Sequence, residues 1–439
     1  MDFSFSKYNV FFEEGNAYYI YNSLTTALIQ VDNLMFNKLK NGSISDVDDT
    51  NFDLLHKKGF VIDKKFDETA AYLYYYNRTR FCDSVRNLNL VIVPTYNCNL
   101  ACSYCLQGNI KKKDTINLED ATRIICFTRK YIENSLNRVP IQKLNITFHG
   151  GEPLLAFDIC NIIAEQTTSI AQQYSIAVNY TMSSNLTLLN TSVIDFIKKY
   201  DIYIQASIDG NELQHDSRRM YRNKKGTYGI ILHNLENLAN NELKKNVIIR
   251  INLDNETIGS AESIINNVRK FSDDIYFAFL RNFKGKNDNY AGLCIADSEC
   301  ASNFDITLSN IYKKYDLSVP ATFGKKGPCS LNCENKYYID CYLDVYKCEL
   351  LLNQPEYRIG FLGENDEIVY LPEYYRQMSW TPEKFNKCMD CVTLPCCGGG
   401  CPAAKKEEYS GDIMNVDCQS PLEVMTQYLK NYVSERVNG

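Results

Sequence analysis

Cysteine is the residue type that most constrains the fold of this chain, because its copies are numerous and unevenly placed. The 439 residues include 18 cysteines but only 4 histidines. Cys98, Cys102 and Cys105 form one group, and ten more cysteines fall between Cys329 and Cys418. Many thiols with few imidazoles favour iron–sulfur clusters or all-cysteine zinc sites over mixed zinc sites. We therefore expect bound metal to hold part of the fold.

Charge and hydropathy exclude several classes of function. Lys plus Arg number 47 and Asp plus Glu 53, a net charge of −6, so no strongly basic surface for nucleic acid is expected. The longest apolar runs have the length of strands and are far shorter than the roughly 20 residues of a membrane-spanning helix. The N-terminus lacks a basic region followed by a continuous apolar stretch, so no signal peptide is visible. These features predict a cytoplasmic protein, in which cysteines bind metal more often than they form disulfides.

Three zones follow one another along the chain. Residues 1–85 combine extended segments around the turn at Gly15 with short helical patterns, which predicts a winged-helix-like module or a cap on the next domain. Residues 86–320 alternate between strand and helix patterns. Residues 321–439 consist of turns, short runs and cysteines, so a metal-held domain is expected there.

The central zone contains six strand candidates separated by amphipathic helical stretches. They are Leu88–Val93, Leu144–Phe148, Val178–Met182, Tyr203–Ser207, Val247–Leu253 and Ile275–Leu280. This alternation predicts an α/β fold, a parallel sheet with right-handed crossovers that forms a partial (β/α)6 TIM-like barrel. Functional side chains gather at the C-terminal strand ends of such folds. The first three cysteines directly follow the first strand, in agreement with this expectation.

The loop with Cys98, Cys102 and Cys105 has the spacing of a cluster site with one open position. A cubane cluster takes four ligands, so three cysteines leave one iron free for a small molecule. A zinc site would need a fourth ligand, and none is near in the sequence. The spacing, with the aromatic Tyr104 before the last cysteine, resembles the signature of the radical S-adenosylmethionine (SAM) superfamily. The resemblance implies that SAM chelates the open iron and that Tyr104 packs near its adenine.

Polar residues after the following strands resemble further motifs of the same superfamily. The resemblance implies cofactor contacts from the glycine-rich loop after the second strand, from the ends of the third and fourth strands, and from an arginine that pairs with the cofactor carboxylate. The candidates are Gly150, Gly151, Glu152, Ser184, Asn185, Ser207 and Arg219. Arg218 is an alternative to Arg219, because one sequence leaves the register open.

The spacing Cys388-x2-Cys391-x5-Cys397-x3-Cys401, followed by Cys418, resembles the SPASM extension of radical SAM peptide-modifying enzymes. The resemblance implies two auxiliary [4Fe–4S] clusters. Their ligand sets would be Cys329, Cys333, Cys348 and Cys401 for the first, and Cys388, Cys391, Cys397 and Cys418 for the second. Cys341 could replace Cys329 as a ligand of the first cluster. Alternatively, one iron of that cluster could stay open to bind a substrate thiolate. Cys396 is expected to be a buried thiol without a ligand role.

Glu349 directly follows Cys348 and is the candidate catalytic residue. In anaerobic sulfatase maturases, which are SPASM relatives, an aspartate at the corresponding position serves as general base. The resemblance implies that Glu349 faces the active-site cavity and accepts a proton after hydrogen abstraction. A solvent-facing glutamate without a catalytic role is the alternative.

The resemblance implies a maturase that installs a thioether or carbon–carbon crosslink in a ribosomally synthesised precursor peptide. Its cofactors would be SAM and three [4Fe–4S] clusters, with an electron donor such as flavodoxin or ferredoxin. Residues 1–85 would bind the leader peptide along a sheet edge. Formylglycine formation on a sulfatase is one alternative function. A non-catalytic iron–sulfur electron-transfer or zinc-binding protein is another.

Overall fold

The computed structural model describes most of the chain and divides it into two compact units. The described residues are 2–42, 48–105, 107, 114–254, 256–272, 274–279, 298–317, 324, 326–384, 386–400, 402 and 422–437. The first unit comprises residues 1–82, 297–329 and 380–439, and the second comprises residues 83–296 and 330–379. The boundary between residues 82 and 83 lies close to the predicted boundary at residue 85, and the division into three domains stays a prediction.

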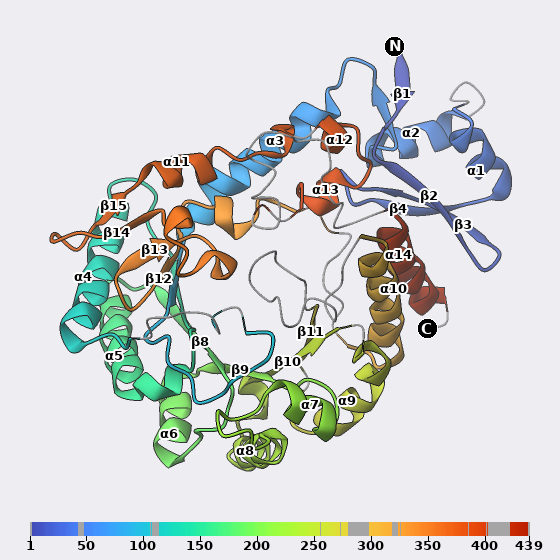
Figure 1. Cartoon of the computed structure of the whole chain (residues 1–439). Helices are drawn as coiled ribbons and strands as arrows, with labels where there is room; N and C mark the ends of the chain where they lie inside the picture. The colour runs from blue at the N-terminus through green and yellow to red at the C-terminus, as the bar shows by residue number, and fades with distance from the viewer. Residues whose placement is uncertain are drawn as a thin grey trace. The chain divides into compact units, whose positions relative to one another are not determined.

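The second unit is built on six parallel strands. They are β6 (Asn87–Ile92), β7 (Lys143–Phe148), β8 (Ala177–Ser184), β9 (Tyr203–Ser207), β10 (Val247–Leu253) and β11 (Asp274–Phe279), and they pair in sequence order. The helices between them are α4 (Leu118–Ser135), α5 (Phe157–Gln173), α6 (Thr191–Tyr200), α7 (Glu212–Arg218), α8 (Tyr228–Asn240) and α9 (Ala261–Val268), as Figure 1 shows. The predicted α/β class with a large central sheet is confirmed.

Side-chain patterning explains why these segments form strands and helices. Along β7 half-buried and buried residues alternate, as expected for a pleated strand. Helices α4 and α6 begin where Asn117 and Asn190 accept hydrogen bonds from the N–H groups of Asp120 and Val193. Such side-chain caps satisfy donors that the first helical turn leaves unpaired.

The central sheet continues beyond β6 with residues that were predicted to belong to a separate cysteine-rich domain. Strand β12 (Lys336–Ile339) pairs in parallel with β6, and β13 (Asp344–Tyr346), β14 (Gly360–Leu362) and β15 (Ile368–Tyr370) follow in antiparallel order. Backbone hydrogen bonds of 2.9 Å join Asn89 N–H to the Asn335 carbonyl and Val93 N–H to the Ile339 carbonyl. Residues 330–379 therefore form part of the second unit.

The first unit contains a three-stranded antiparallel sheet beside short helices. The sheet has the order β2 (Asn9–Glu14), β3 (Ala17–Asn22) and β4 (Leu28–Val31), and β1 (Phe3–Phe5) pairs separately with β5 (Val61–Asp63). The α-helices described in this unit are α1 (Asn33–Lys40), α2 (Asp49–Lys58), α3 (Glu68–Arg78), α10 (Ser298–Lys314), α12 (Asn386–Met389), α13 (Leu394–Cys397) and α14 (Leu422–Val437). This sheet and α1–α3 agree with the small mixed module expected at the N-terminus, while its winged-helix character stays a prediction.

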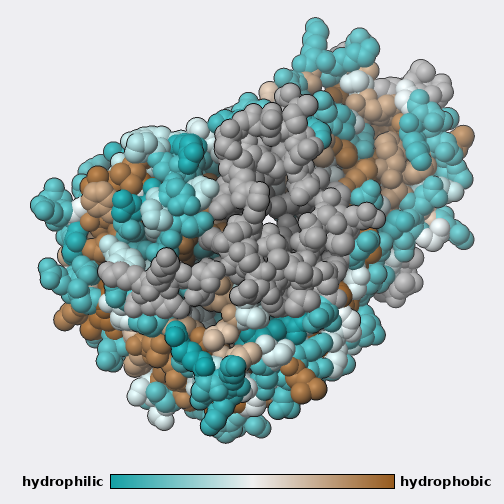
Figure 2. Space-filling view, viewed as in Figure 1, coloured by the Kyte–Doolittle hydropathy of each residue, from teal (hydrophilic) through white to brown (hydrophobic). Residues whose placement is uncertain are grey.

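Hydrophobic side chains are scattered among hydrophilic ones on the face shown in Figure 2. Within the described ranges, every helix is too short or too polar to cross a bilayer.

Candidate active site

The loop after β6 presents the three thiols of Cys98, Cys102 and Cys105, all half-buried and outside any disulfide. Two backbone hydrogen bonds fix the loop against the end of α7, from Ala101 N–H to the Met220 carbonyl (2.8 Å) and from Ser103 N–H to the Arg218 carbonyl (2.9 Å). Burial raises the pKa of Cys98, and it raises the pKa of Cys102 to about 12. The thiols of Cys98 and Cys102 therefore stay protonated until a metal replaces the protons.

The three thiols after β6 are the donors for the predicted metal site. In the part of the chain that the structure describes, no three His, Cys, Asp or Glu side chains are arranged to hold one metal ion. The thiolates of a [4Fe–4S] cluster bind different iron atoms, so they need not converge on one point. Three free thiols on one loop are the donors that the predicted cluster takes, and the cluster itself stays a prediction.

Positions 150 and 151, after β7, require glycine, because the backbone there comes very close to the cysteine loop. Gly150 has a φ of +139°, and a Cβ atom there would lie 2.5 Å from the Thr95 carbonyl oxygen. At Gly151 a Cβ atom would lie 2.1 Å from the Asn97 carbonyl oxygen. Neither position accepts a side chain unless the backbone of the cysteine loop moves.

Replacing Gly151 with alanine is therefore expected to displace the cysteine loop. Iron bound after anaerobic reconstitution should fall by about four atoms per chain, the content of one cubane cluster. Gly229, in α8, is the matched control, because an added Cβ there meets no atom within 4 Å. Wild-type iron content in Gly151→Ala, equal to that of Gly229→Ala, would show that the close approach does not matter for the cluster.

Glu152 joins the ends of β7 and β8. Its fully buried carboxylate accepts hydrogen bonds from Ser184 Oγ (2.8 Å), Asn185 N–H (2.7 Å) and Leu154 N–H (3.1 Å). Burial raises the pKa of Glu152, although these hydrogen bonds partly offset the shift. Asn185 Nδ2 also lies 3.8 Å from Cys98 Sγ. The structure thus brings Glu152, Ser184 and Asn185 together beside the first cysteine.

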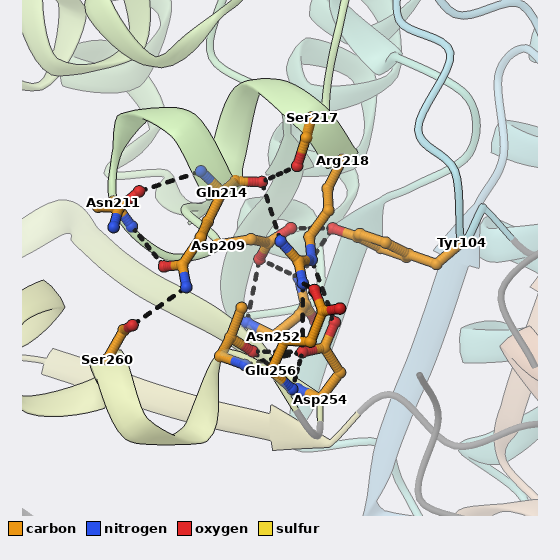
Figure 3. A network of polar contacts seen from close by, with 11 residues as sticks. Tyr104, Asp209, Asn211, Gln214, Ser217, Arg218, Asn252, Asp254, Glu256 and Ser260 are labelled. Carbon is orange, nitrogen blue, oxygen red and sulfur yellow. Dashed lines mark hydrogen bonds and ion pairs between the residues drawn. The ribbon is translucent and has the colours of Figure 1, made fainter. Parts of the chain in front are cut away.

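Tyr104 lies in a buried polar network at the ends of β9 and β10 (Figure 3). Its hydroxyl donates to Asp209 and accepts from Arg219 Nη1 at 2.6 Å. Asn252 Nδ2 lies 3.2 Å from the same hydroxyl and 2.9 Å from Asp209 Oδ1. Burial raises the pKa of Tyr104 well above its ordinary value, so the hydroxyl keeps its proton.

Arg219 carries a buried donor that suits an anionic ligand. Its Nη1 lies 3.8 Å from Asp209 Oδ2, and its buried Nε has no hydrogen-bond partner among the described residues. Burial would lower the pKa of Arg219, but the neighbouring Tyr104, Cys102 and Asp209 raise it. A permanently charged guanidinium with a spare N–H fits the carboxylate of the expected cofactor.

The structure also separates Arg219 from its alternative, Arg218. Arg218 Nη2 forms ion pairs with Asp254 (3.0 Å) and Glu256 (2.8 Å), as Figure 3 shows. Helix α7 ends at Arg218, and Arg219 leaves helical geometry with φ −122° and ψ 65°. Consecutive side chains therefore diverge, and Arg219 is the one that contacts Tyr104.

Three residues of this region were not among the predicted site residues, namely Asp209, His215 and Asn252. His215 is fully buried; its Nδ1 accepts from Asp209 N–H at 3.2 Å, and burial lowers its pKa to about 4. Asn252 is a buried amide inside the apolar strand β10, a pattern that could have singled it out. Ser207, predicted as a contact, is the half-buried last residue of β9 and lies outside the hydrogen bonds described above.

Glu349 lies at the end of β7, close to the glycine loop. Its Oε2 is 3.7 Å from His149 Nε2, and His149 immediately precedes Gly150. The buried Nδ1 of His149 has no hydrogen-bond partner among the described residues. Burial lowers the pKa of His149, although the Glu349 carboxylate opposes this shift. The Glu349 side chain is 41% exposed, so it is accessible to a substrate.

Cys333 and Cys348 flank the two strands of the β12–β13 hairpin. The fully buried Lys347 ties the two ends together, because its Nζ donates to the carbonyls of Cys333 (2.5 Å), Lys336 (2.7 Å) and Glu334 (3.3 Å). Cys341 lies in the turn at the opposite end of the hairpin, a strand length away. The alternative in which Cys341 joins Cys333 and Cys348 is therefore disfavoured.

The other predicted cluster ligands lie in the first unit or outside the described residues. Cys329, Cys388, Cys391 and Cys397 are half-buried thiols of the first unit, while Cys401 and Cys418 lie outside the described residues. Cys396 is buried, as expected, with its Sγ 3.6 Å from the Tyr21 hydroxyl. The ligand sets of both auxiliary clusters stay predictions.

Comparison with known proteins places this site in a family. Residues 92–268 match the model of the Radical SAM superfamily. The cysteine-type anaerobic sulfatase-maturating enzyme of Clostridium novyi is 24% identical over 369 residues, which cover 76% of this chain and 94% of that enzyme. The solved structure of native anSMEcpe with bound AdoMet and Kp18Cys peptide has a TM-score of 0.63 at 16% identity, covering 80% of this chain and 98% of that one.

A second solved structure has a similar fold over more of the chain. Streptococcus suis SuiB bound to precursor peptide SuiA has a TM-score of 0.54 at 15% identity, covering 95% of this chain and 99% of that one. Members of the superfamily bind SAM and a [4Fe–4S] cluster, and the thiols of Cys98, Cys102 and Cys105 with the buried Arg219 fit these two groups. This chain therefore carries a radical SAM domain and is an enzyme of the radical SAM superfamily.

Proposed function

We propose that this enzyme is a radical SAM/SPASM maturase that installs a thioether or carbon–carbon crosslink in a ribosomally synthesised precursor peptide. The observation that carries the proposal is the small sheet module of residues 1–82, which precedes the parallel sheet. The sulfatase-maturase structure aligns with 80% of this chain, whereas the SuiB structure with its precursor peptide aligns with 95%. The likeness in fold therefore reaches further along the chain for the structure that holds a precursor peptide.

The residues of the radical SAM domain would hold and orient the cofactors. SAM bound to the cluster supplies, on one-electron reduction, a 5′-deoxyadenosyl radical that removes a hydrogen atom from the substrate. Arg219 would pair with the carboxylate of SAM, and Glu152 would accept a hydrogen bond from its amino group. Tyr104, held by Asp209 and Asn252, would form one wall of the adenine site.

Two auxiliary [4Fe–4S] clusters complete the proposed cofactor set. Their ligands would be Cys329, Cys333, Cys348 and Cys401 for one cluster, and Cys388, Cys391, Cys397 and Cys418 for the other. They would accept the electron released when the crosslink forms, or bind a substrate sulfur. An electron donor such as flavodoxin or ferredoxin would reduce the cluster at Cys98, Cys102 and Cys105.

The leader of the precursor would add a strand to the sheet of the first unit at β4. Strand β2 contacts α14, where Ser434 Oγ donates to Glu14 at 2.9 Å, whereas β4 is the other edge strand. Asn22 N–H donates to the Ala27 carbonyl at 2.9 Å, so the hydrogen-bonded residues of β4 are Ile29 and Val31. Leu28 and Gln30 therefore direct their backbone N–H and C=O groups to the open edge, as strand addition requires.

Replacing Gln30 with proline tests this partner assignment. Proline removes one outward N–H group but leaves the pairing of β3 with β4 intact. Affinity for the leader peptide, measured by fluorescence anisotropy, should fall at least about fivefold, the equivalent of one net hydrogen bond of about 1 kcal/mol. Gln30→Ala keeps the N–H group and should bind as the wild type does. Equal affinities of the two variants would remove β4 as the leader site.

Formylglycine formation remains a second candidate. The similarity to the Clostridium novyi sulfatase-maturating enzyme over 76% of this chain favours it. The two functions differ in substrate, a precursor peptide or a sulfatase segment, and product analysis separates them.

A further inference from the structure

The N-terminal residues 1–82 share a hydrophobic core with the cysteine segment near the C-terminus. The buried members of this core are Tyr8, Leu24, Tyr72, Tyr76, Trp380 and Leu394. Cys388, Met389 and Cys391 pack against it. Each part therefore covers apolar surface of the other, and neither buries this core alone.

A second core links the same two parts of the chain on the three-stranded sheet. Val10, Phe12, Tyr19 and Tyr21 of β2 and β3 pack with Cys396 and with Met425, Leu429 and Val433 of α14. Helix α14 thus covers one face of the sheet with its apolar side chains. Removing residues 1–82 would expose both cores, so point variants are better suited than a deletion for testing the role of these residues.

Polar contacts hold the backbone on both sides of Cys391. Lys7 Nζ donates to the Met389 carbonyl at 2.9 Å, and Ser23 Oγ donates to the Val392 carbonyl at 2.5 Å. Ser23 is fully buried, and its own carbonyl accepts from Cys396 Sγ at 3.7 Å. Two residues of the N-terminal sheet region therefore fix the positions next to a predicted cluster ligand.

The surroundings of the three described cysteines fit an iron–sulfur cluster. Cys388, Cys391 and Cys397 are half-buried thiols in one short segment, and the residues that pack against the first two are largely apolar. An apolar shell limits water at a cluster, and outer contacts that orient the ligands contribute strongly to metal affinity. Thiols that are already held in position therefore lower the free-energy cost of binding the cluster.

We propose that residues 1–82 are the scaffold of the Cys388–Cys397 segment, with Lys7 and Ser23 as positioning residues for its iron–sulfur ligands. This inference rests on the ligand roles of Cys388, Cys391 and Cys397 in the proposed function. The proposed leader-binding module of residues 1–82 and one auxiliary cluster would then belong to a single structural unit. A peptide bound to the module would then act on the packing around that cluster.

The double variant Lys7→Met/Ser23→Ala tests the proposal by iron analysis. Reconstituted wild-type protein should hold about twelve iron atoms per chain and the double variant about eight, at about four per cubane cluster. Formation of 5′-deoxyadenosine should persist in the variant, because Cys98, Cys102 and Cys105 lie in the other unit. Lys64→Met is the control; Lys64 belongs to the same module and pairs with Asp2 at 2.6 Å on the surface.

Thiol labelling of metal-free protein provides a readout that does not depend on cluster assembly. Cys388, Cys391 and Cys397 should react several times faster with an alkylating reagent in the double variant than in Lys64→Met. Unchanged labelling together with unchanged iron content would overturn the proposal. Faster labelling in a protein whose wild type holds about four iron atoms per chain would support the scaffold but refute the auxiliary clusters of the proposed function.

Discussion

Replacing Cys98, Cys102 and Cys105 together with alanine is expected to abolish the cleavage of SAM. The three thiols lie on one loop after β6, and a cluster without their thiolates has no anchor there. Chromatography of the reduced, reconstituted variant with SAM should show no 5′-deoxyadenosine. Its iron content should fall by about four atoms per chain, while any auxiliary clusters stay in place.

Two other cysteines provide the control for this variant. Cys82 is exposed and Cys126 is half-buried, and neither belongs to a group with ligand spacing. Cys82→Ala/Cys126→Ala should therefore keep both the iron content and the cleavage rate. Production of 5′-deoxyadenosine by the triple variant would mean that the catalytic cluster is bound elsewhere.

Replacing Glu349 with glutamine is expected to remove most of the crosslinked product without stopping SAM cleavage. Glu349 Oε2 lies 3.7 Å from His149 Nε2 beside the glycine loop, and glutamine keeps the size of the side chain but not the base. Burial lowers the pKa of His149, so its ring is neutral at pH 7. Loss of a general base costs about 10²–10⁴-fold in rate. Mass spectrometry of the peptide and chromatography of 5′-deoxyadenosine measure the two reactions.

A nearby exposed glutamate separates a catalytic role from a general effect of charge. Glu356, in the same part of the second unit, is exposed, and Glu356→Gln should retain full product formation. A loss below about fivefold in Glu349→Gln would identify a bystander carboxylate. Binding of a substrate thiol to a cluster could then supply the activation, because a bound metal lowers the pKa of a thiol. Substitutions near Cys329 would in that case strongly reduce product formation.

The parallel sheet was predictable because its strands are short apolar runs between amphipathic helices. The predicted ranges Tyr203–Ser207 and Val247–Leu253 coincide with β9 and β10. Strand β12 was missed, because its partner β6 lies far away in the sequence and its four residues stand in a turn-rich region. Pairing between distant short strands leaves little local signal.

Site residues could be predicted where a characteristic residue type directly follows a predicted strand. They could not be predicted where their role depends on the three-dimensional arrangement of the folded chain. Cys98, Glu152 and Asn185 follow strands β6, β7 and β8 and come together as expected. The choice between Arg218 and Arg219 depends on the residue at which α7 ends. Two adjacent arginines in a sequence do not reveal that position. Lys347 was missed, because only the folded hairpin brings its ammonium onto three carbonyls.

The most direct test of the proposed function is product analysis with two competing substrates. Reduced, reconstituted enzyme and SAM would be incubated with a short cysteine- or aromatic-rich peptide encoded beside this gene, or with a sulfatase peptide that carries the residue to be oxidised. We expect the precursor peptide to lose two hydrogen atoms through an internal crosslink, in step with the formation of 5′-deoxyadenosine, while the sulfatase peptide stays unchanged. Formylglycine in the sulfatase peptide with no change in the precursor would contradict it.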